Sequence, residues 1–72
     1  MAEKTYKLIE LVGVSDKSYE DAIQNAVSVA SETLKGLAWF EVVELRGKIE
    51  DGMVVEYQAK VHLAFEIMRG EA

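Results

Sequence analysis

The sequence predicts a single α+β domain over residues 1–72, in which a strand, a helix and two further strands follow one another. A three-stranded antiparallel sheet is expected to wrap around the one helix. Three observations support this fold class. The chain has 72 residues, of which 50% are apolar, and this length allows one core but not two. One segment carries apolar residues at helical spacing, and a later segment alternates apolar with polar residues, as a half-buried strand does.

The first strand is predicted over Tyr6–Val12, a segment rich in aromatic and branched residues. Gly13 is expected to end this strand, and the polar residues 14–17 are expected to form a loop. The helix should begin at Ser18, whose hydroxyl can cap the backbone three residues on. It should end where Gly36 can adopt the left-handed conformation that closes many helices. The apolar stripe of the helix consists of Ile23, Ala26, Val27, Ala30 and Leu34.

The rest of the chain is predicted to be a hairpin of two strands, Trp39–Ile49 and Met53–Ile67. Odd-numbered positions of the second strand are apolar and most even-numbered positions are polar, so its odd face should meet the helix. A three-residue loop, 50–52, keeps the odd positions of both strands on one face, whereas a two-residue turn would oppose odd with even positions. This register sets Arg46 opposite Glu56 as a cross-strand charge pair.

Composition narrows the possible partners and location. Eight Lys and Arg stand against thirteen Asp and Glu, for a net charge of −5, which argues against binding to nucleic acid or to an anionic membrane surface. The chain has no cysteine and one histidine, so no metal site is expected within one chain. The N-terminus lacks the apolar core of a signal peptide, and we expect a cytoplasmic protein. A small apolar chain with open sheet edges favours self-association.

Candidate functional side chains lie on the hairpin, although no catalytic arrangement is apparent. Glu41 and Glu44 are three apart, which would place them on opposite faces of a strand. Trp39 shares the odd phase and is either a core aromatic residue or a stacking platform for a flat ligand. Arg46 either pairs with an acid or binds a phosphate. Gln58 either faces solvent or presents a donor and an acceptor to the edge of a heterocycle.

Four short segments in this order and spacing resemble the dodecin family: Glu10–Gly13, Trp39–Val42, Arg46–Ile49 and Glu56–Gln58. The resemblance covers about residues 4–67. It implies a small flavin-binding protein of β-α-β-β fold, in which twelve copies form a hollow sphere. It also implies that flavins bind in pairs at twofold axes, between tryptophans of related subunits.

For individual residues, the resemblance implies that Trp39 stacks on the flavin and that Gln58 bonds to the edge of the isoalloxazine. Arg46 stands where bacterial members carry an arginine near the ligand, so FMN is expected in preference to riboflavin. Some relatives carry a second basic residue where this chain has Glu66, and this departure leaves riboflavin or FAD as alternatives. Twelve chains at −5 each would carry −60, so bound cations are expected to relieve the repulsion.

The function implied by the resemblance is storage and sequestration of flavin, with protection against flavin photochemistry, and not catalysis. A sandwiched flavin offers no open face to a substrate, as a flavin enzyme would require. Two alternatives remain open. One is an oligomeric interaction module that binds no flavin, and the other is a flavin-dependent oxidoreductase.

Overall fold

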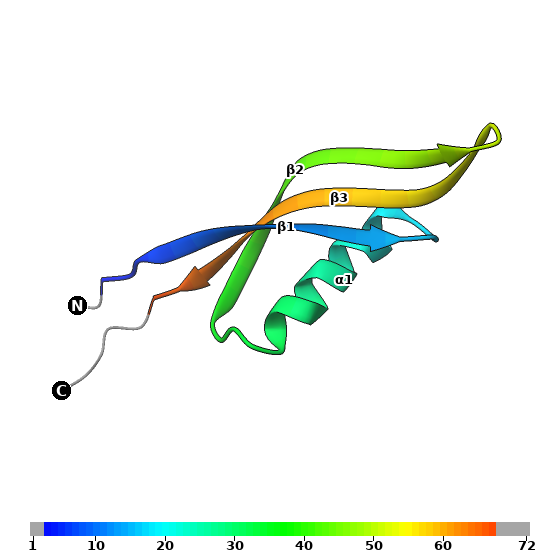
Figure 1. Cartoon of the computed structure of the whole chain (residues 1–72). Helices are drawn as coiled ribbons and strands as arrows, with labels where there is room; N and C mark the ends of the chain where they lie inside the picture. Colours follow the sequence, from blue (N-terminus) through cyan, green and yellow to red (C-terminus); the bar gives the residue numbers. More distant parts are fainter. Residues whose placement is uncertain (1–2, 68–72) are drawn as a thin grey trace.

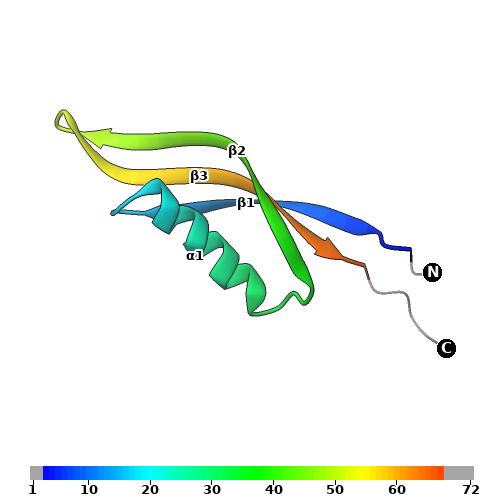
Figure 2. The same ribbon diagram turned by 180° about the vertical axis from the view of Figure 1, so that it is seen from behind.

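The β-α-β-β order, the single helix and the three-stranded antiparallel sheet are confirmed in the computed structural model (Figure 1). The structure describes residues 3–67, so both ends of the predicted 1–72 domain lie outside the described residues. The strand order in the sheet is β1-β3-β2, and the helix lies against one face, as the view from behind also shows (Figure 2). The elements are β1 (Tyr6–Ser15), α1 (Tyr19–Ser31), β2 (Leu37–Glu50) and β3 (Met53–Glu66).

The helix begins as predicted but ends earlier. The Ser18 hydroxyl accepts a hydrogen bond from the backbone N–H of Asp21 at 2.9 Å, which satisfies one of the free donors of the first turn. The last helical residue is Ser31. After it, the backbone N–H of Glu32 bonds to the carbonyl of Val29 and that of Thr33 to the carbonyl of Ala30, each three residues back, which tightens the final turn. No basic residue lies in the last turn to favour its extension. Gly36, with φ of +81°, therefore lies in the loop before β2 and not at the helix end.

The core forms where small helical residues meet the middle of β3. Ala22, Ala26 and Ala30 of α1 are buried against Ala59, Val61 and Leu63 of β3. This confirms the odd face of β3 as the face toward the helix. Gly13 does not end β1 as expected, since the strand continues to Ser15. A Cβ at Gly13 would lie 2.0 Å from the carbonyl oxygen of Ala22, so glycine is required there for close approach of the helix.

The predicted three-residue loop is wrong, because Asp51 and Gly52 alone connect the hairpin strands. Both residues have positive φ, +52° and +76°, as a two-residue hairpin turn that matches the twist of the strands requires. A β-bulge between Lys48 and Ile49 then shifts the register by one residue. The bulge restores the pairing of odd with odd positions that the longer loop was expected to provide.

The bulge also changes the partner predicted for Arg46. Lys48 faces Glu56, and Arg46 faces Gln58. The expected charge pair between Arg46 and Glu56 is therefore wrong. The register instead brings together two of the residues predicted to bind a ligand, Arg46 and Gln58.

A second irregularity, between Val42 and Glu44, inverts the faces of the first part of β2. Phe40 pairs with Leu63 and therefore points to the helix side, whereas Trp39 pairs with Ala64 and points away. The prediction that Trp39 shares the odd, helix-facing phase is wrong. Val43 is the additional residue at this bulge, and it reverses the faces of residues 39–42 because the strand period is two. A third register shift, between Leu37 and Trp39, ends this reversed stretch.

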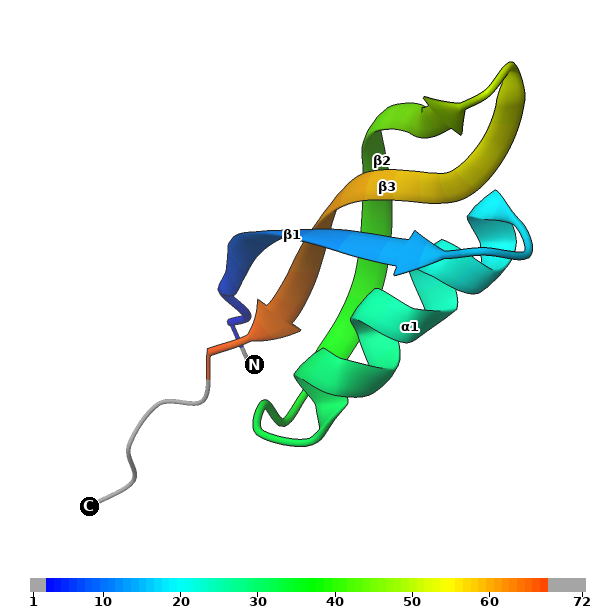
Figure 3. The same cartoon turned by 45° about the vertical axis from the view of Figure 1, so that its right-hand side comes forward.

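The helix-facing side of β2 is left largely uncovered, since α1 packs on β1 and β3. Figure 3 shows the β2–β3 hairpin extending beyond the helix. Phe40, Val42 and Leu45 are 49%, 46% and 47% exposed on this side, in a molecule 58 × 20 × 13 Å in extent. Within the described residues, no helix has the length and apolar character needed to cross a bilayer.

Candidate functional site

The face of the sheet turned away from α1, here called the helix-free face, carries all three residues predicted to bind a ligand. Paired residues of neighbouring antiparallel strands point to the same side, so the register identifies this face strand by strand. Its members on β2 are Trp39, Glu41, Glu44, Arg46 and Lys48. Its members on β3 are Glu56, Gln58, Lys60, His62 and Ala64, and those on β1 are Tyr6, Leu8, Glu10, Val12 and Val14.

Trp39 stands at one end of the helix-free face with its indole 44% exposed. Its Nε1–H donates a hydrogen bond to Oε2 of Glu41 at 3.0 Å. The ring of Tyr6 lies 4.7 Å away, centroid to centroid, at an interplanar angle of 56°. The two rings come from β1 and β2, across the central strand, where Ala64 is fully buried. The indole is thus fixed from two sides while a large part of its surface stays accessible.

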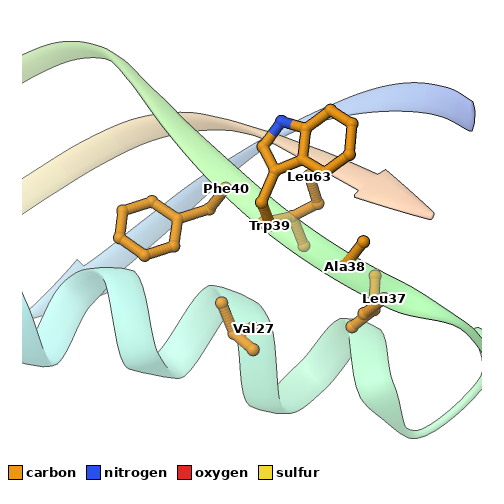
Figure 4. A pocket seen from close by; sticks show the side chains of 6 residues that line it. All are labelled: Val27, Leu37, Ala38, Trp39, Phe40 and Leu63. Carbon is orange, nitrogen blue, oxygen red and sulfur yellow. The ribbon is translucent and has the colours of Figure 1, made fainter.

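Figure 4 shows the indole projecting from β2 on the side opposite Phe40, which points toward α1. A hollow of about 170 Å³ lies between α1 and the start of β2. Its lining is mostly apolar and so offers few groups to orient a polar ligand. The lining residues are Val27, Leu37, Ala38, Trp39, Phe40 and Leu63.

Arg46 and Gln58 form the second part of the candidate site. Nε of Arg46 donates to Oε1 of Gln58 at 2.7 Å, and Nε2 of Gln58 donates to Oε2 of Glu56 at 2.7 Å. The guanidinium also lies 3.8 Å from the Glu44 carboxylate. These bonds hold the amide and the guanidinium side by side, with the Arg46 side chain about half exposed.

One chain does not bring the tryptophan and the polar pair together. Trp39 pairs with Ala64 and Arg46 pairs with Gln58, and these two partners are six residues apart on β3. At about 3.3 Å per residue, the separation along the sheet is roughly 20 Å. The three residues predicted to bind a ligand thus lie on one face of the sheet but form two separate groups in a single chain.

A row of charged residues, which sequence reasoning missed, lies between the two groups. His62 is 3.9 Å from Glu10 and 4.0 Å from Glu41, on either side of it. Lys60 is 3.6 Å from Glu10 and 3.5 Å from Glu44. Glu41 and Glu44 both face this row, contrary to expectation, because the bulge at Val43 separates them. The sequence carries no signal for that bulge.

The chemistry of the helix-free face is that of a binding surface with an aromatic platform and charged donors. Among residues 3–67, no cluster of three histidine, cysteine or acidic side chains has the geometry to hold a metal ion. A flat ligand can stack on the indole, while Gln58 and Arg46 can provide an amide and a cation.

Comparison with known proteins connects this geometry to a family. Residues 5–68 match the family model Dodecin. The chain is 47% identical over 64 residues to the dodecin of Thermus thermophilus, which covers 89% of this chain and 93% of the relative. Dodecin from Streptomyces coelicolor has a TM-score of 0.91 at 43% identity, covering 97% of this chain and 100% of the other. Dodecin from Streptomyces davaonensis has a TM-score of 0.90 at 37% identity, with coverages of 94% and 100%. The chain belongs to the dodecin family.

Proposed function

We propose that this protein binds and stores flavin, with FMN favoured over riboflavin or FAD. The observation that carries the proposal is the half-exposed indole of Trp39 on the helix-free face, held by Tyr6 and Glu41. An indole presented in this way offers a flat apolar surface on which an isoalloxazine can stack. Family membership supports the choice of ligand, because dodecins bind flavins.

The flavin site is proposed to form between chains. The distance along β3 from Trp39 to Gln58 is too long for one stacked ring system to contact both in the same chain. A neighbouring copy can supply the missing group. The uncovered apolar side chains of β2, Phe40, Val42 and Leu45, support such assembly, because exposed apolar area of this kind marks interaction sites. A dodecamer is proposed from the family, with cations bound where the acidic chains meet.

Gln58 and Arg46 would provide selectivity within this site. The Gln58 amide can bond to the polar edge of the isoalloxazine, which has both donors and acceptors. The Arg46 guanidinium can bind the phosphate of FMN through a charge-assisted hydrogen bond. Riboflavin lacks that phosphate, so Arg46 favours FMN.

Storage is proposed in preference to catalysis. A flavin enclosed by indoles has no open face for a substrate, and an indole in contact with an excited flavin quenches it before photochemistry occurs. A flavin-dependent oxidoreductase would instead need steady turnover with a reductant. An interaction module without flavin would leave the ligand's fluorescence unchanged.

The direct test is a titration of FMN, and in parallel of riboflavin, with protein freed of flavin, following flavin fluorescence. Quenching that saturates near one flavin per chain is the expected result, with tighter binding of FMN. Unchanged fluorescence at micromolar protein would contradict flavin binding. Steady oxidation of a nicotinamide cofactor by the loaded protein would contradict the storage function.

A further inference from the structure

We infer that Glu41 is a positioning residue for the stacking platform, because its carboxylate sets the plane in which the Trp39 indole presents itself. The inference rests on the proposed flavin site and adds to it a residue that itself makes no contact with the ligand. Trp39 and Glu41 are two apart on β2 and so share the helix-free face. The hydrogen bond between Nε1 and Oε2 measures 3.0 Å.

The indole needs such an anchor because it is only partly packed. At 44% exposure, the side chain has room for more than one ring orientation. The ring of Tyr6 contacts the indole at an interplanar angle of 56°. This contact limits where the indole lies, but it leaves the indole free to rotate about its own Cβ–Cγ bond. A hydrogen bond to an ionised acceptor is directional and stronger than a neutral one. Glu41 therefore lowers the ordering cost that a flat ligand would otherwise meet on stacking.

The Glu41 carboxylate also lies close to His62, on the side away from the indole bond. Oε2 of Glu41 accepts from the indole, and Oε1 lies 4.0 Å from Nδ1 of His62. From β1, Glu10 faces the imidazole at 3.9 Å, and Lys60 precedes it on the same face of β3, while α1 packs on the opposite face of the sheet. Glu41 therefore lies between the indole and the charged row of the helix-free face, with one carboxylate oxygen toward each.

Two carboxylate substitutions separate the hydrogen bond from the charge. Glu41→Gln removes the charge but keeps an oxygen acceptor at the same reach, whereas Glu41→Ala removes both. Glu10→Ala is the matched control. It removes a carboxylate that lies on the other side of His62, and it leaves the hydrogen bond between Trp39 and Glu41 in place. Both positions are exposed, and size-exclusion chromatography checks that each of the three variants keeps the size of the wild-type assembly.

The first readout needs no ligand. The chain has one tryptophan, so a ¹H–¹⁵N NMR spectrum of flavin-free protein contains one indole N–H signal. We expect Glu41→Ala to move this signal upfield and broaden it, and Glu41→Gln and Glu10→Ala to leave it near its wild-type position.

The second readout is FMN affinity from fluorescence quenching. We expect Glu41→Ala to weaken binding about fivefold relative to Glu41→Gln, the size of effect expected for one hydrogen bond. An indole signal and an affinity unchanged in Glu41→Ala would overturn the inference, and so would an equal loss of affinity in Glu10→Ala. Absence of quenching by wild-type protein would overturn the proposed function instead, and the NMR comparison would still decide whether Glu41 orients the indole.

Discussion

Arg46 donates its Nε–H to Oε1 of Gln58 at 2.7 Å across β2 and β3. This bond occupies the amide oxygen and leaves the terminal nitrogens of the guanidinium for other partners. The Glu44 carboxylate lies 3.8 Å from Nη1. A ligand phosphate would therefore compete with Glu44 for the guanidinium, and Gln58 would keep the arginine in place while it did so.

Replacing Trp39 by alanine should weaken FMN binding at least about tenfold and leave the assembly intact. Stacking of a flat base on an aromatic side chain contributes about 1–3 kcal/mol. Tyr6 is the other aromatic residue on the helix-free face as defined above, and its ring is tilted against the indole. Fluorescence titration measures the affinity, and size-exclusion chromatography measures the assembly. An affinity equal to that of the wild type would rule out the stacking model.

Replacing Arg46 by alanine should weaken FMN binding about fivefold to tenfold and change riboflavin binding little. The reason is that a charge-assisted hydrogen bond to phosphate is lost, while the ring contacts stay. Parallel titrations with the two flavins provide the comparison, and Arg46→Lys keeps the charge without the planar donor fork. Equal losses for the two flavins would show that Arg46 does not bind the phosphate.

Replacing Gln58 by alanine should weaken binding of both flavins by about 1 kcal/mol, because one hydrogen bond to the ring edge is removed. Both flavins carry the same ring, so the loss should be the same for each, in contrast to the Arg46 variant. The same pair of titrations measures it. An unchanged affinity would mean that the amide serves only its bonds to Arg46 and Glu56.

Replacing Gly13 by alanine should lower the free energy of unfolding by about 2 kcal/mol or more, because the new Cβ would overlap the carbonyl oxygen of Ala22. Denaturant unfolding measures the effect. Gly52→Ala is the control: its Cβ has no atom within 4 Å, but φ is +76°, so its cost of about 1 kcal/mol reflects backbone strain alone. A Gly13 variant as stable as wild type would show that the helix can sit further from β1.

The fold was predictable from the sequence mainly through β3 and the helix start. The extra residue at Val43 belongs to β2, while each residue of β3 from Ala59 to Leu63 has a partner on both sides. The alternation along this part of β3 therefore predicted the buried face correctly. Ser18 was recognisable as a cap because the capping bond is local. Gly13 was predicted to end a strand, whereas its role is to let the helix approach β1 closely at Ala22. Such a close approach leaves no local pattern in the sequence.

The candidate site was predicted in part. Arg46 and Gln58 were placed on one face correctly, since Arg46 and its partner Gln58 lie in the regular stretch between the shifts at Val42/Glu44 and Lys48/Ile49. The face of Trp39 was predicted wrongly, and Glu41 was not recognised as its partner, because both precede the bulge at Val43. A bulge bends and twists the strand to fit the sheet around it, and valine is among the residues that regular strands favour, so nothing local marks this position.

The additional residue at Val43 exchanges the two faces of the sheet for the side chains of residues 39–42. Without it, the pleat would turn Phe40 outward and carry the indole toward the helix, with nearly the same composition and the same fold. The side on which this protein presents its aromatic platform is therefore determined by the presence of one residue and hardly at all by that residue's chemistry. A deletion or insertion at this point would alter ligand recognition more than many substitutions within the site itself.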